Sequence, residues 1–158
     1  GTTAIQANDL VGRKTARDGG AVARALIGRM NDTAAELSAS ANADLAAIGG
    51  RLAAAVVAYA ETVDYVVSRM KVDIRGVFAG SFAYLKLAGI AHGGWQLGRA
   101  AAASARLLEQ GSDDRAFHAA KITTARFFAD HVLTAAAGLR DSIVDGSAGV
   151  LGLPAEQF

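Results

Sequence analysis

Hydrophobic residues recur at every third or fourth position along most of the chain, which is the spacing of one face of an α-helix. The clearest row predicts one long helix and consists of Leu45, Ile48, Leu52, Val56, Tyr59, Val63, Val66 and Met70. The sequence contains no strict alternation of apolar and polar residues over the length of a strand. The pattern therefore predicts an all-α fold.

Polar and glycine-rich breaks divide the chain into about five helical segments. They lie at Asp18-Gly19-Gly20, Ser40-Ala41-Asn42, Lys71-Val72-Asp73, Gly111-Ser112-Asp113 and Gly146. The first segment, from Thr2 to Arg17, is shorter than the helices that follow it. Because the connections are short, neighbouring helices should run antiparallel. We predict an antiparallel up-and-down bundle of about four long helices preceded by one shorter helix, with a hinge at Asp18-Gly19-Gly20.

The later segments differ in how many apolar faces they carry. The second segment has one row, formed by Val22, Leu26, Met30, Ala34, Leu37 and Ala41. The fourth runs from about Asp73 to Gln110, and the fifth starts after Gly111-Ser112-Asp113-Asp114 with two rows. One row holds Phe117, Ala120, Thr124, Phe128, His131 and Ala135; the other holds Ile122, Ala125, Ala129, Val132, Ala136, Leu139 and Ile143. Two apolar rows predict a helix that is packed on both sides.

Glycines pair at a spacing of four in the fourth segment. The pairs are Gly76 and Gly80, Gly89 and Gly93, and Gly94 and Gly98. Each glycine inside a helix costs about 0.8–1.0 kcal/mol relative to alanine, so several of them need a reason. We expect close backbone approach between packed helices, with a transmembrane pairing face as the alternative.

Composition and charge exclude several classes of protein. The 16 Lys and Arg residues nearly balance the 15 Asp and Glu residues, so nucleic acid is not an expected partner. The absence of Cys excludes disulfide scaffolds and thiolate metal sites. The most apolar window, residues 76–98, contains Lys86 and His92, and a central Lys costs about 2.5–3.5 kcal/mol in a membrane. We therefore expect a cytoplasmic protein with no membrane span and no signal peptide.

Residues able to carry chemistry are few. The three histidines show no metal-ligand spacing; we expect His131 at the edge of the core and His118 to be exposed. Glu61 and Asp64 could share a helix face, as a catalytic carboxylate pair would, but we expect them to belong to an interhelical polar network or a solvated edge. Trp95 is expected to fill a gap between helices, with stacking on a cofactor as the alternative. No metal site is predicted.

A helix-ending turn explains the pair Gly19-Gly20 better than an anion site at a helix N-terminus. From pattern and composition alone, the chain is an Ala-rich helical bundle without an assigned role.

The first fourteen residues, from Gly1 to Lys14, read GTTAIQANDLVGRK. They resemble the segment YEGTxxIQxxDLVGRK near the end of acyl-CoA dehydrogenases. The stretches Phe82 to Gly89, Gly93 to Trp95, Ala119 to Ala129 and Leu153 to Phe158 are similar to the extra C-terminal helical module of one subgroup. That subgroup includes methylmercaptopropionyl-CoA dehydrogenase-like enzymes, and the resemblance extends over essentially the whole chain.

The resemblance implies roles for the first four positions. In the family, the Glu directly before the motif's Gly is the catalytic base, so that Glu would immediately precede Gly1 and no catalytic residue is expected within this chain. Gly1 matches the substrate-contacting glycine. Thr2, Thr3 and Ala4 match residues that contact FAD. Many relatives have Gln where Ala4 stands, which leaves a backbone contact at that position.

The resemblance also implies a division of the chain and a set of partners. Residues 1–18 would be the last helix of the dehydrogenase helical domain, 19–146 a C-terminal four-helix bundle module, and 147–158 a C-terminal tail. The full-length flavoprotein would oxidise acyl-CoA to enoyl-CoA with FAD in fatty acid metabolism. It would pass electrons to an electron-transfer flavoprotein and form a homodimer or higher homo-oligomer.

This segment alone would be structural, inactive and without retained FAD, because it lacks both a base and a hydride acceptor. Two alternatives remain: a standalone helical module for binding or assembly, and an amphipathic protein on membranes or storage granules.

Overall fold

The computed structural model describes residues 2–157, and every regular element within them is helical. This confirms the predicted all-α class. The elements, in chain order, are α1 (Thr3–Asp9), the π-helix η1 (Leu10–Ala16), α2 (Ala21–Ser38), α3 (Ala43–Arg69), α4 (Ile74–Ala79), α5 (Ser81–Glu109), α6 (Arg115–His131), the 3₁₀-helix η2 (Leu133–Ala135), α7 (Ala136–Val144), α8 (Ser147–Leu151) and the 3₁₀-helix η3 (Ala155–Gln157).

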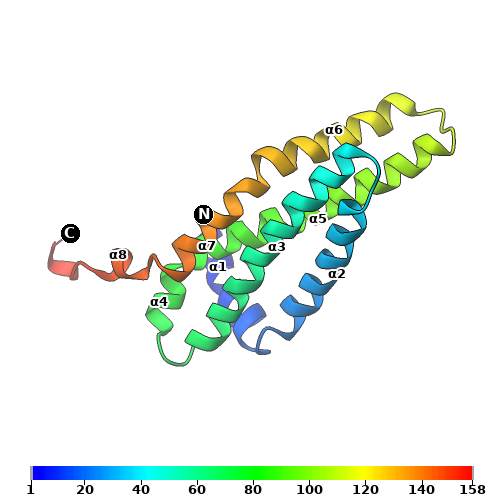
Figure 1. The fold of residues 1–158 in the computed structure, drawn as a ribbon. Coiled ribbons are helices and arrows are strands. Elements are labelled where there is room, and N and C mark those ends of the chain that lie inside the picture. Colours follow the sequence, from blue (N-terminus) through cyan, green and yellow to red (C-terminus); the bar gives the residue numbers. More distant parts are fainter. Residues whose placement is uncertain (1, 158) are drawn as a thin grey trace.

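Four long helices lie side by side along one axis and form the predicted bundle (Figure 1). A tight loop joins α2 to α3, and another joins α5 to α6, so each pair is an antiparallel hairpin. Helix α7 continues the direction of α6 after the short η2 turn. The two elements α1 and η1 lie against α5, and α8 leads to the C-terminal end away from the bundle (Figure 1).

The core is centred on α3 and α5, which contribute the most buried residues. All members of the predicted α3 row from Leu45 to Val66 are buried, and Met70 packs at its end. This helix is also the one element of residues 2–157 that is long and apolar enough to cross a membrane, with a mean hydropathy of 1.4 over its most apolar 18 residues. Here its apolar face packs against the other helices of the bundle.

The buried face of α2 differs from the predicted row at its start. Val22 is 61% exposed and Leu26 is only partly buried, whereas Ala23 and Ile27 are in the core. From Met30 onward the predicted row is buried as far as Leu37, and Ala41 is exposed. Adjacent residues of a helix point about 100° apart, so the predicted row at the start of α2 lies beside the packed face rather than on it.

The predicted helix from residue 73 to 110 is two helices. Asp73 accepts a hydrogen bond from the Gly76 backbone N–H at 3.0 Å and caps α4. The break falls at Gly80, where a Cβ atom would lie 3.2 Å from the Cα of Ile143, so the close approach favours glycine. Helix α4 therefore turns across the end of the bundle before α5 begins.

Close packing explains some of the paired glycines of α5. A Cβ atom at Gly94 would lie 2.7 Å from Leu133, and one at Gly98 would lie 2.9 Å from Leu37. These contacts confirm close approach at both positions. Gly89 has nothing within 4 Å of that point, so close packing within residues 2–157 does not account for it.

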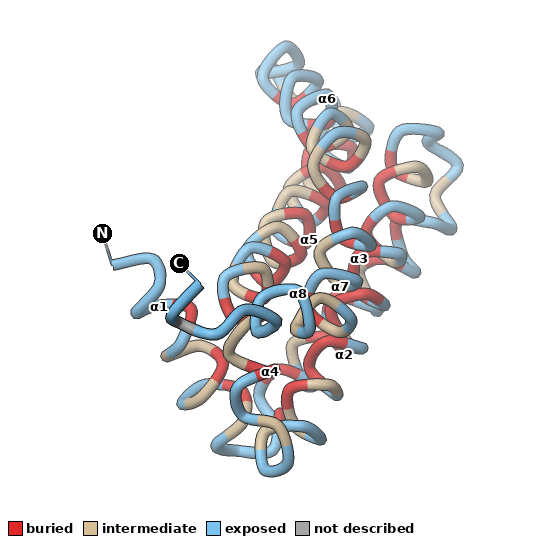
Figure 2. Tube along the Cα trace, turned by 90° about the vertical axis from the view of Figure 1, so that its left-hand side faces the viewer, coloured by how far each residue is buried: buried red, intermediate tan, exposed pale blue. Residues whose placement is uncertain are grey.

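Within residues 2–157, α6 is packed along one face, and the expectation of two packed faces was wrong; of the outer row, Phe128 packs against the core but Phe117, Thr124 and His131 are exposed. Buried positions follow the inner row, shown by Ile122, Ala125 and Ala129, while Phe117 is 56% exposed. Helix α6 lies at the edge of the bundle, where α3 and α5 cover one side of it. Figure 2 shows the same division, with buried residues along the facing sides of the helices and an exposed stretch at α8.

Candidate functional site

The N-terminal segment folds back on the bundle and ends in a sharp turn. Ala7, Val11 and Thr15 are buried, whereas Ile5 is 67% exposed. Gly19 and Gly20 have φ of 65° and 80°, a left-handed conformation that glycine adopts without steric cost. The segment is therefore not continuous with α2, as the predicted hinge requires.

The Asp18 side chain stabilises that turn by hydrogen bonds to its backbone. Its carboxylate accepts hydrogen bonds from the backbone N–H of Val22 at 3.1 Å and of Gly20 at 2.9 Å. These donors stabilise the charged form and lower the pKa of the Asp18 carboxyl below its ordinary value. The expected helix-ending turn is confirmed.

The residues assigned by resemblance lie at the free end of α1. Thr2, Thr3 and Ala4 are all exposed, and the Thr2 side chain makes no capping hydrogen bond. Gly1, expected to contact substrate, lies outside the described residues. The flavin and substrate contacts of these positions stay predictions.

An open-mouthed cavity of about 240 Å³ lies next to this segment, between η1, α2, α3 and α5. Its floor consists of buried residues, and its rim is exposed. The floor is formed by Thr15, Ala23, Tyr59 and Ala88; Leu10, Leu26, Leu85 and His92 form the walls; Lys14, Val22 and Gly89 form the rim. The lining is therefore mostly apolar, with a few polar groups.

Two buried tyrosines lie at the base of the cavity and behind it. The Thr15 hydroxyl and the Tyr84 hydroxyl are hydrogen-bonded at 2.9 Å, and the Tyr59 and Tyr84 rings are 5.9 Å apart. Burial raises the pKa of both tyrosines, so they stay neutral at physiological pH.

His92, on the wall of the cavity, donates a hydrogen bond from Nδ1 to the backbone carbonyl of Ala88 at 2.7 Å. Because a carbonyl oxygen only accepts, Nδ1 carries the proton.

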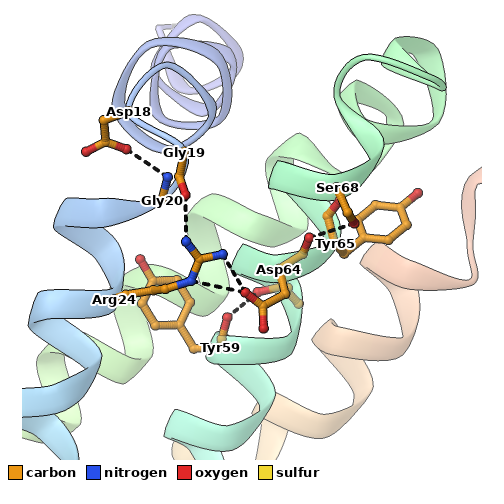
Figure 3. A network of polar contacts seen from close by, with 9 residues as sticks. Asp18, Gly19, Gly20, Arg24, Tyr59, Asp64, Tyr65 and Ser68 are labelled. Carbon is orange, nitrogen blue, oxygen red and sulfur yellow. Dashed lines mark hydrogen bonds and ion pairs between the residues drawn. The ribbon is translucent and has the colours of Figure 1, made fainter.

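The carboxylates Glu61 and Asp64 belong to separate interhelical contacts. The Arg24 guanidinium donates to Asp64 at 2.7 and 3.2 Å and to the Gly19 carbonyl at 2.6 Å, which ties the turn to α3 (Figure 3). Glu61 instead accepts from Arg140 of α7 at 2.7 Å. The interhelical polar network is thus confirmed, and the two carboxylates do not act as a pair.

The histidines of α6 are placed differently from expectation. His118 is buried rather than exposed, because it falls on the inner row of α6, where its ring nitrogens approach Ser104 at 3.4 Å and Ser112 at 3.2 Å. His131, expected at the core edge, is exposed and packs beside Phe127. Within the described part of the chain, no three His, Asp or Glu residues gather as metal ligands would.

Trp95 fills a gap between α2 and α5, as expected. It is buried, and its indole N–H donates to the Thr33 hydroxyl at 2.9 Å. Arg99 lies over the exposed side of the ring, 5.5 Å from its centre.

Sequence reasoning missed the cavity and its polar residues Lys14, Thr15 and His92. Thr15 lies in a polar stretch that carries no apolar period. It lies four residues after the buried Val11 and shares its face, but a buried polar residue adds nothing to a hydrophobic period.

Comparison with known proteins assigns the chain to a family. Residues 26–154 match the family model described as acetyl-CoA dehydrogenase C-terminal like, and the chain belongs to this family of C-terminal domains. Among curated relatives is the 3-methylmercaptopropionyl-CoA dehydrogenase of Ruegeria pomeroyi, which is 42% identical over 145 residues. The alignment covers 92% of this chain and 24% of that protein. The chain therefore spans about a quarter of the length of this relative, and the resemblance to the C-terminal region of acyl-CoA dehydrogenases is confirmed.

Proposed function

We propose that this chain is the C-terminal helical part of an FAD-dependent acyl-CoA dehydrogenase that converts acyl-CoA thioesters to enoyl-CoA. The observation that carries the proposal is the alignment with a named acyl-CoA dehydrogenase over 92% of the chain at 42% identity. The motif of the first fourteen residues supports it, because the same motif follows the catalytic glutamate in that family. The base would then immediately precede Gly1, and residues 1–158 would contribute no catalytic side chain.

The role of this part is structural. Exposed arginines join its helices, as Arg126 joins Asp44 of α3 at 3.1 Å and Arg140 joins Glu61 at 2.7 Å. Such exposed pairs contribute little to stability, so the apolar core supplies most of it. The left-handed turn at Gly19 and Gly20 supports a boundary there, with residues 1–18 belonging to the preceding helical domain, 19–146 forming the module and 147–158 the tail.

We propose that the described residues do not hold FAD by themselves. The cavity beside η1, at about 240 Å³, is smaller than the roughly 300–1,000 Å³ of sites for drug-sized ligands, and FAD is larger still. A second hollow of about 460 Å³ at the α5–α6 turn is bounded by Asp113 and Asp114, whose charges oppose a pyrophosphate. We propose that the flavin and the acyl-CoA are bound by the remainder of a longer protein, with Gly1, Thr2, Thr3 and Ala4 at their edge. An electron-transfer flavoprotein as acceptor and a homo-oligomeric assembly belong to the same proposal.

The purified chain 1–158 tests the proposal directly. It should be folded by circular dichroism, lack flavin absorbance and reduce no dye when acyl-CoA is added. In the longer protein, replacing the glutamate that precedes Gly1 by Gln should abolish substrate-dependent flavin bleaching while the flavin stays bound. Stoichiometric FAD on residues 1–158 alone would contradict the assignment, and a start codon directly before Gly1 in the gene would favour the standalone module.

A further inference from the structure

The cavity beside η1 depends on an uncommon local structure. Leu10, Lys14 and Thr15 all line it, and all three lie in the seven-residue π-helix. A π-helix closes i→i+5 hydrogen bonds, so Leu10 and Thr15 lie one turn apart on the same side. In an α-helix, five residues would separate them by about 140°. The π winding therefore directs both residues toward one cavity, and π-helical turns are frequent at functional sites.

The opposite rim is left open by α5. Of the helix-interior glycines of α5, Gly93, Gly94 and Gly98 each have a neighbouring side chain within 4 Å of the point that a Cβ atom would occupy, but Gly89 has none among residues 2–157. Gly89 lines the cavity, and Val22 opposite it is a large apolar side chain left mostly exposed. The bare backbone thus borders space that a methyl group would begin to fill.

Size and lining indicate an apolar ligand chain. An apolar protein cavity of about 150 Å³ stays dry and binds benzene, with its six carbons. Scaled by volume, the cavity of about 240 Å³ accommodates a chain of roughly eight to ten carbons. Leu10, Leu26 and Leu85 on the walls are the side chains that would contact it.

The charge at the rim indicates an anionic head. Lys14 is the one Lys or Arg among the residues that line the cavity, and no Asp or Glu lines it. In the described chain, no carboxylate lies within ion-pair distance of the Lys14 amine, whereas the neighbouring cations Arg13 and Arg24 are paired with Asp9 and Asp64. A carboxylate at the rim would find a free ammonium there, and the apolar floor would take its tail.

We propose that this cavity binds a medium-chain carboxylate, with the alkyl chain between η1, α2, α3 and α5 and the carboxylate at Lys14. This is a site separate from the flavin chemistry proposed above, and it requires neither FAD nor the catalytic glutamate.

Titration of the chain 1–158 with alkyl carboxylates, followed by NMR, tests the proposal. Octanoate and decanoate should bind saturably, shift the signals of Leu26 and Leu85, and give contacts between the ligand chain and the Tyr59 ring. Affinity should rise about fourfold with each added methylene from hexanoate to octanoate, and it should level off beyond about ten carbons as the cavity fills.

Two variants test the binding of the ligand's alkyl chain and of its carboxylate separately. Gly89→Leu should remain folded, because its Cβ meets nothing, and it should fill the cavity and abolish decanoate binding. Gly50→Leu, at an exposed α3 glycine that also has nothing within 4 Å and lies outside the cavity, is the matched control and should bind normally. Lys14→Met should weaken the binding of decanoate at least about tenfold, as expected for the loss of a charged hydrogen bond. It should leave the affinity for 1-decanol unchanged.

Several results would overturn the proposal. No saturable binding of decanoate at millimolar concentration would do so, as would binding that Gly89→Leu leaves intact. Equal loss of decanoate and decanol in Lys14→Met would remove the carboxylate from the site. If the longer protein excludes decanoate and Gly89→Leu destabilises only that longer protein, the cavity is instead a packing surface for another part of the same polypeptide.

Discussion

Gly49 of α3 lies close to the backbone of α2, and replacing it by alanine should destabilise the bundle. A Cβ atom there would lie 2.8 Å from the Ala34 carbonyl oxygen and would overlap the Ser38 backbone nitrogen. Because ordinary carbon contacts need about 3.5–4.0 Å, the two helices must separate by about 1 Å. Backbone cannot rotate away as a flexible side chain can, which places the cost at the upper end of the overpacking range, about 3 kcal/mol. The gain in helix propensity returns about 1 kcal/mol, so the net loss is about 2 kcal/mol.

The neighbouring glycine supplies the control. Gly50 lies in the same helix with nothing within 4 Å, so Gly50→Ala should gain about 0.8–1.0 kcal/mol in helix propensity without a clash. For a chain of this size, 1 kcal/mol shifts Tm by about 2–4 °C. Thermal unfolding followed by circular dichroism should show Gly49→Ala about 4–8 °C below the parent and Gly50→Ala about 2–4 °C above it. Equal stabilisation by both substitutions would refute the contact between the two backbones.

Three further substitutions test separate contacts. Gly93→Leu should cost about 1–3 kcal/mol, since its Cβ would already lie 3.2 Å from the Phe128 ring, and an unchanged Tm would contradict packing there. Trp95→Phe should cost about 0.5–1.5 kcal/mol through the lost bond to Thr33, and a double-mutant cycle with Thr33→Val should recover most of that cost as coupling. Asp18→Ala should lower Tm above about pH 4, because the lowered pKa of Asp18 stabilises the fold only while its carboxylate is charged. As the pH falls below the folded-state pKa, parent and variant should converge, and a constant difference down to pH 2 would disprove the role of the charge.

The helices that could be predicted from sequence are those whose buried rows are made of large side chains. In α3, Ile48, Leu52 and Val63 mark the packed face without ambiguity, and the structure buries all three. In α2, alanines occupy both the packed side and the exposed side. The hydrophobic spacing therefore predicted a helix but did not decide which of Val22 and Ala23 faces inward. Alanine contributes little burial energy in either place, which leaves the choice to tertiary contacts.

The packing of α6 and the cavity beside η1 could not be predicted from the sequence, each for a physical reason. The expectation that α6 packs on both sides followed from its two apolar rows, but among residues 2–157 its long neighbours are α3 and α5, which cover one side of it. Thr15 lines the same cavity as Leu10 because the winding of η1 departs from 3.6 residues per turn. Periodicity analysis assumes 3.6 residues per turn, which places Lys14 on the face of Leu10 but Thr15 about 140° away from it.

The π-helix also fixes the angular position of everything N-terminal to it. Residues five apart return to the same side in η1, whereas residues four apart do so in an α-helix. Removing one residue from Leu10–Ala16 while the stretch adopts α winding would therefore leave Ala7 buried against the bundle and Ile5 exposed. Adopting α winding without that deletion would instead rotate the chain before η1 by about 100° around the helix axis and move Ala7 from its place. The π winding of η1 thus accommodates one extra residue while it keeps the rotational phase between the bundle and whatever polypeptide is joined ahead of Thr3.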